Sequence, residues 1–421
     1  MSCLNAIKVK NKKRWIDLAL LNLCTVAFLG MTLRSKILFS LPLINYNNLL
    51  QAHEHFAFGG WVTLALMVLM VYELLPESLY KKAGYQWLFG SIFLCSWCML
   101  LNFSFSGLSS VANLFSTLFI VLTYFFSYIF LKDISKTAVS RTVRLLSVTG
   151  IVCMVLSSTG PFMLDYLFTS KSLNAILYRD ALFTYLHLMY NGFFTLSVFA
   201  LLFARLEPKI TIGTKRNTYR FSVLLCLSIL PSLFLSYLWH DADALLKAIA
   251  LAGSLLLLLS FIWFIIFALP LIKIYRTMPS TLRYIGLLSM AAFMLKLILQ
   301  SLTIFPAVGD AVFGDRPIII GFLHLVFLAF VSLFTLAYLV QAGWLDIENK
   351  FTRIALAVFT LGVLLNEGFL MAQGLGAMFI KSSHLFPWLL WITSICLFIG
   401  ALLIVIARAK TNAAAVLPAL K

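Results

Sequence analysis

Long apolar stretches, separated by short polar segments, recur along the whole chain. The apolar stretches cover residues 15–33, 52–75, 84–105, 107–131, 141–163, 179–205, 218–240, 245–272, 283–305, 317–342, 353–377 and 387–408. A helix needs about 20 mostly apolar residues to cross the hydrocarbon core of a bilayer. The stretches are continuous and lack the period-two alternation of membrane barrel strands. The pattern therefore predicts an all-α, polytopic membrane protein with about twelve transmembrane helices.

Composition supports lipid as the main solvent of this chain. Of its residues, 62% are hydrophobic and 11% are charged, whereas roughly 25% are charged in soluble domains. The twelve stretches leave no room for a separate soluble domain, so we expect one transmembrane domain over residues 1–421. The expected surroundings of that domain are the lipid bilayer.

The net charge of +17 would suit a nucleic-acid partner, but the distribution of the charges gives another explanation. If residues 1–14 form a basic cytoplasmic N-terminus, 24 Lys and Arg lie on the inner side and 7 on the outer side, and Lys296 lies within a span. Such an excess of positive charge on one side is typical of cytoplasmic loops. We therefore expect an integral protein of a bacterial inner membrane, with both termini in the cytoplasm and no nucleic-acid partner.

Three of the predicted spans share a sequence pattern. The pattern is a histidine, at His55, His187 and His324, followed by an aromatic residue at +3, a small residue at +5, an aromatic residue at +6, Ser or Thr at +8 and Leu at +9. The histidines are 132 and 137 residues apart, which is four spans each time. Repeats at a fixed spacing indicate a repeated architecture. They predict a pseudo-threefold arrangement of four-helix units, approximately residues 1–131, 132–272 and 273–421.

All six histidines fall in the outer half of the predicted topology, including His53, His55, His187, His240 and His324. A histidine inside a membrane is costly and is usually functional or paired. Each ring considered alone could equally be a hydrogen-bonded core histidine. Considered together, the one-sided set favours a shared cofactor site, since neutral imidazole is the common ligand of haem iron, copper and zinc.

The placement of these histidines on spans two, six, seven and ten of twelve resembles the haem–copper oxidase superfamily. The segment His53-Glu-His55-Phe-Ala-Phe-Gly59 is also similar to the opening of the NnrS family of haem- and copper-containing membrane proteins. The resemblance implies the fold of oxidase subunit I, with His55 (or His53) and His324 as axial haem ligands. It further implies a remnant copper site at His187 and His240, and a haem propionate near Arg179.

The resemblance also indicates an incomplete binuclear site. Phe322 and Trp239 occupy positions where the oxidases carry further histidines, and Tyr190 stands three residues after His187 instead of four. The expected function is therefore electron transfer or NO and O2 handling at a haem, with copper as an additional ligand of the protein and with a redox protein or a diatomic gas as partner. Whether the chain is an enzyme stays open, and a secondary transporter of the twelve-helix type is the alternative.

Two charged residues lie near the middle of predicted spans. Lys296 and Glu367 have similar depth in spans nine and eleven, so they could form a structural ion pair or line a polar path. We expect the structure to show one of these two arrangements.

Overall fold

The computed structural model describes residues 2–314, 316–378 and 383–416. The side chains of residues 2–13, most of the predicted basic N-terminus, lie outside the described part. Helices and no strand form the described part, which confirms the all-α prediction. Twelve helical segments of it are long and apolar enough to cross a membrane: Arg14–Leu38, Tyr46–Leu74, Ala83–Ser106, Ser110–Ile134, Arg141–Thr169, Ala175–Lys209, Ile212–Tyr237, Ala244–Arg276, Ser280–Leu302, Arg316–Gln341, Lys350–Gly376 and Leu385–Thr411.

Several spans consist of consecutive helical elements. In chain order the elements are α1 (Ser2–Leu38), α2 (Tyr46–His55), η1 (Phe56–Thr63), α3 (Leu64–Leu74), α4 (Glu77–Tyr80), α5 (Ala83–Ser106), α6 (Ser110–Ile134), α7 (Arg141–Ser157), α8 (Thr159–Thr169), α9 (Ala175–His187), η2 (Leu188–Phe194), α10 (Thr195–Leu206), η3 (Glu207–Lys209), α11 (Ile212–Leu233), η4 (Phe234–Tyr237), α12 (Ala244–Ala268), η5 (Leu269–Leu271), α13 (Ile272–Arg276), α14 (Ser280–Leu302), α15 (Pro306–Gly314), α16 (Arg316–His324), η6 (Leu325–Ser332), α17 (Leu333–Gln341), α18 (Lys350–Met378) and α19 (Leu385–Val416).

The second span begins earlier than its apolar stretch predicts. Its first helix starts at Tyr46, where the side chain of Asn45 accepts a hydrogen bond from the backbone N–H of Asn48 at 3.1 Å. Such a cap allows a helix to begin among polar residues, beyond the apolar stretch. His53 consequently lies seven residues inside the helix, about 10 Å from its start at 1.5 Å per residue, and not at its opening.

The three spans that carry the sequence repeat change helix type at the same place. A π-helical segment follows directly after each repeat histidine: η1 after His55, η2 after His187 and η6 after His324. Short π-helical insertions in α-helices are rare and often occur at functional sites. The sequence repeat therefore corresponds to a repeated backbone feature.

These three spans meet along the centre of the molecule. The ring of Phe327 in η6 lies 4.3 Å from that of Phe58 in η1 and 5.4 Å from that of Phe194 in η2. Near the C-terminal ends of the same spans, the Glu73 carboxylate accepts hydrogen bonds from Arg205 and Tyr338, each at 3.2 Å. Spans two, six and ten are thus joined at two levels along their length, by aromatic rings at one level and by hydrogen bonds to Glu73 at the other.

The first helix of each predicted unit packs on the π-helical segment of its second span. Asn22 of α1 donates to the Gly60 carbonyl at 2.6 Å, and Ser289 of α14 donates to the Phe330 carbonyl at 2.8 Å. In the middle unit, α7 packs against η2. The local repeat is clear, whereas the pseudo-threefold arrangement of whole four-helix units and its likeness to an oxidase subunit stay predictions.

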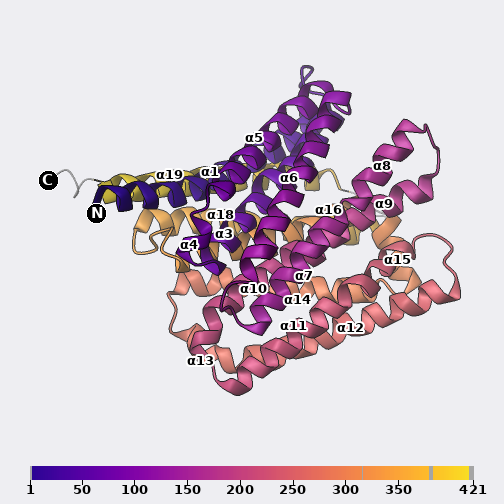
Figure 1. The fold of residues 1–421 in the computed structure, drawn as a ribbon. Helices are drawn as coiled ribbons and strands as arrows, with labels where there is room; N and C mark the ends of the chain where they lie inside the picture. Colours follow the sequence, from indigo (N-terminus) through magenta and orange to yellow (C-terminus); the bar gives the residue numbers. More distant parts are fainter. Residues whose placement is uncertain (1, 315, 379–382, 417–421) are drawn as a thin grey trace.

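The first and last spans lie side by side, so the chain closes on itself (Figure 1). The Arg408 guanidinium of α19 donates to the Asp17 carboxylate of α1 at 2.6 Å. Farther along the same two helices, Trp391 donates to the hydroxyl of Ser35 at 2.9 Å.

Candidate functional site

Helices α1, α2 and α16 bring Arg34, His53 and His324 together. His53 lies within electrostatic range of both His324 and the Arg34 guanidinium, and His324 lies within range of Arg34. The His53 ring also packs against α1 at Gly30, where an added Cβ would come within 3.4 Å of its Cε1 atom. Arg34, His53 and His324 are far apart in the sequence but lie within electrostatic range of one another, and we call them the histidine cluster.

Each of these two rings has one nitrogen bound to a backbone carbonyl. His324 donates from Nδ1 to the Ile320 carbonyl at 2.8 Å, and His53 bonds the Val26 carbonyl of α1. Among the described residues, the second nitrogen of each ring has no hydrogen-bond partner: Nδ1 of His53, which is buried, and Nε2 of His324. An imidazole held at one nitrogen by a carbonyl, with the other nitrogen available, is the usual arrangement of a metal-ligating histidine.

His55 occupies a different side of the same helix. Its Nδ1 donates to the Gln51 carbonyl at 2.9 Å, and its ring stacks on Phe103 of α5 with 4.3 Å between ring centroids. Residues i and i+2 of an α-helix point in directions about 200° apart around the helix axis. His53 and His55 therefore face different neighbours. The structure brings His53, and not His55, to Arg34 and His324.

Two arginines near Tyr46 of α2 were not among the residues selected from the sequence. Arg34 lies within electrostatic range of Tyr46, and the Arg316 guanidinium lies over the ring of Tyr46, 6.0 Å from its centroid. From the sequence these two residues counted only as outer-side charges. Both arginines lie at the ends of spans one and ten that adjoin Tyr46, and this placement is the signal that could have identified them.

Arg179 and His240 belong to another group of contacts, between α9 and the segment after span seven. The Arg179 guanidinium lies over the Trp239 ring, 4.4 Å from its centroid. His240 Nε2 and Trp239 Nε1 both contact the Asp180 carboxylate, at 3.2 and 2.9 Å. The roles predicted for Arg179 at a propionate and for His240 at copper stay predictions.

His187 is fully buried, and both of its ring nitrogens are occupied. Nε2 donates to the Ile229 carbonyl of α11 at 2.8 Å, and Nδ1 accepts from the Asn191 amide at 3.0 Å. A copper ion would have to replace one of these bonds. Within the described residues, no three His, Cys, Asp or Glu side chains are placed so that they could hold a metal ion together.

Lys296 and Glu367 do not form an ion pair in the part of the chain that the structure describes. Lys296 is buried in α14, with its Nζ 5.8 Å from the centroid of the Phe293 ring. Glu367 in α18 accepts a hydrogen bond from the neighbouring Asn366 amide at 3.1 Å.

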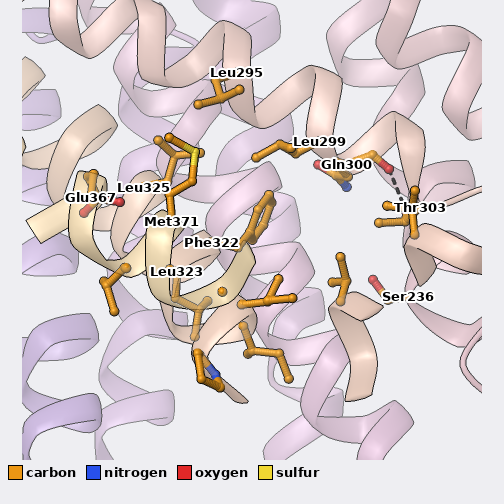
Figure 2. Close-up of a pocket in the computed structure, with 18 of the residues that line it drawn as sticks. Ser236, Leu295, Leu299, Gln300, Thr303, Phe322, Leu323, Leu325, Glu367 and Met371 are labelled. Carbon is orange, nitrogen blue, oxygen red and sulfur yellow. Dashed lines mark hydrogen bonds between the residues drawn. The ribbon is translucent and has the colours of Figure 1, made fainter. Parts of the chain in front are cut away.

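A cavity of about 300 Å³ lies between α9, α14, α16 and α18 (Figure 2). Its walls are mostly apolar, and its polar members include Tyr190, Gln300 and Glu367. The Tyr190 ring lies 5.9 Å from that of Phe322, another wall residue. The cavity adjoins the stretch of α16 and η6 that carries His324, since Leu323 and Leu325 line it as well.

No protein-family model matches this chain, and no curated protein matches its sequence. The functional reading therefore depends on the residues and contacts described above. The most specific of these is the pair of histidines that shares Arg34.

Proposed function

We propose that this chain is a haem-binding integral membrane protein in which His53 and His324 would hold the haem iron. The observation that supports the proposal is their shared arrangement: one nitrogen of each ring is held by a backbone carbonyl, and the other is free of hydrogen bonds within the described residues. Histidines that converge from separate helices are a common way to build a cofactor site in a helix bundle.

The charges around the pair suit the same ligand. Arg34 and Arg316 lie at the outer ends of their spans, where guanidinium groups can bind carboxylates such as haem propionates with two parallel hydrogen bonds. The absence of a side chain at Gly30 lets the His53 ring pack against α1. His53 and His324 would hold the iron, and the arginines would compensate the negative charge of the propionates.

A bound haem would supply one-electron redox chemistry or gas binding. The protein residues would orient the ring and exclude water from it. We propose electron transfer, or NO and O2 handling, near the outer face of a bacterial inner membrane, with both termini in the cytoplasm. Copper is not part of the proposal, because both nitrogens of His187 are already bonded.

The test is the haem and iron content of the purified protein and of two single variants. The wild-type chain should carry haem, and His53→Phe and His324→Phe should each lose most of it. His55→Phe is the matched control, because the new ring can keep the stacking on Phe103. Loss of haem in the control with retention in His53→Phe would refute the ligand assignment, and a wild-type chain without haem would refute the proposal.

A further inference from the structure

The mouth of the cavity between α14 and α18 opens toward lipid. Leu295 and Leu299 of α14 and Met371 and Leu375 of α18 line it, and 37%, 36%, 56% and 51% of their respective surfaces are exposed. Both helices are membrane spans, so the molecules that meet this opening are those dissolved in the bilayer. A mostly apolar cavity of about 300 Å³ is at the lower end of the range for small-molecule sites.

Gln300 gives this cavity a polar anchor. Only 6% of Gln300 is exposed, and both its Oε1 and its Nε2 are buried with no hydrogen-bond partner among the described residues. Buried amides are nearly always hydrogen-bonded, because an unpaired donor or acceptor in an apolar surrounding is costly. The side chain lines the cavity (Figure 2), so a ligand with an oxygen atom could satisfy it.

A second polar group lies at the other end of the same cavity. In Figure 2, Glu367 and Gln300 stand at opposite ends, with Phe322 and Met371 between them. The complementary ligand is flat and lipophilic and carries an oxygen at each end. A fatty acyl chain offers oxygen at one end alone, whereas a quinone or quinol ring offers it at both.

We propose that this cavity binds the ring of a membrane quinone or quinol, which enters from the lipid between α14 and α18. One ring oxygen bonds the Gln300 amide, the other faces Glu367, and the ring packs on Phe322. The tail leaves through the mouth between Leu299 and Met371. This site is separate from the histidine cluster and does not depend on haem.

The experiment uses the full chain in liposomes with a photoreactive azido-benzoquinone that carries a decyl tail. Adducts mapped by mass spectrometry should fall on α16 and α18, around Phe322 and Met371. Gln300→Leu keeps the volume of the side chain and removes its hydrogen bonds. In this variant, the probe concentration that gives half-maximal labelling should rise about tenfold, as expected for one lost hydrogen bond.

Matched tryptophan variants on one helix test the route. Leu299→Trp fills the mouth and should abolish labelling, whereas Leu302→Trp, on the same helix but outside the cavity lining, should label like the wild type. Decylbenzene, which has the ring and tail without the oxygens, should not compete. Equal labelling of both tryptophan variants, or full competition by decylbenzene, would overturn the proposal, whatever the haem content of the protein.

Discussion

The hydrogen bonds of each ring nitrogen separate the histidines of this chain into two kinds. His187 has both nitrogens bonded to protein groups, whereas His53 and His324 each have one nitrogen without such a bond among the described residues. Sequence spacing could not make this distinction, because all three lie at similar depth on apolar spans. One of the two hydrogen bonds of the His187 ring is to the backbone carbonyl of Ile229, which is 42 residues away in the sequence.

Replacement of His187 by alanine should destabilise the protein without removing haem. The substitution leaves the Asn191 amide without its bond to the ring and opens a buried cavity, which together cost about 2–4 kcal/mol. Thermal unfolding of the detergent-purified variant should show a lower midpoint. His384→Ala is the control, since His384 is exposed, and an unchanged midpoint for His187→Ala would contradict the structural role.

Replacement of Gly30 by leucine should reduce haem content while the protein still folds. An added Cβ at Gly30 already reaches 3.4 Å from the His53 ring, so a larger side chain displaces that ring from its position. Gly286→Leu is the matched control, because no atom lies within 4 Å of the position of its Cβ. The ratio of haem to protein, measured after size-exclusion chromatography, should fall in the first variant and stay constant in the second.

At the scale of elements, the repeat in the sequence predicted which spans are equivalent, but not their change of helix type. In two of the repeats, the hydroxyl at +8 bonds the carbonyl five residues earlier: Thr195 to Tyr190 at 2.6 Å and Ser332 to Phe327 at 2.8 Å. A pattern of apolar positions indicates which face of a helix is buried. It does not indicate which carbonyl accepts the hydrogen bond of each backbone N–H. The π-helical segments therefore required the structure.

The hydroxyl of Ser332 also joins two of these segments, since it accepts a hydrogen bond from Trp61 Nε1 at 2.8 Å. Ser332→Ala removes the partner of a buried indole N–H and should destabilise the protein. A double-mutant cycle with Trp61→Phe should give a coupling energy of about 1 kcal/mol in unfolding experiments. Strictly additive effects would show that the bond does not hold η1 and η6 together.

At the scale of the whole molecule, the number and order of the spans could be predicted because backbone groups in lipid must be satisfied within each helix. The convergence of particular side chains could not. Arg34 approaches the two histidines, and Arg316 approaches Tyr46, only through the folding of α1 and α16 around α2. Lys296 and Glu367 were expected at similar depth, and no ion pair joins them within the described residues. Equal depth gives only the position of a side chain along the membrane normal. The rotation of its helix decides which neighbours the side chain faces.

The charge distribution predicts the orientation of the protein in the membrane. Alkaline phosphatase fused after Leu43 or Leu173, which are 99% and 97% exposed, should be active, because these loops lie on the outer side in the predicted topology. A fusion after Ile212, which is 86% exposed, should be inactive. The reverse pattern would invert the topology and place the histidine cluster near the cytoplasm.

The optical spectrum of the purified chain, recorded in the oxidised and the dithionite-reduced state, tests the central claim most directly. Two histidine ligands would give low-spin iron, so the account predicts a Soret band and a sharp α-band on reduction. A spectrum without a Soret band, from protein made in cells with ample haem, would contradict it.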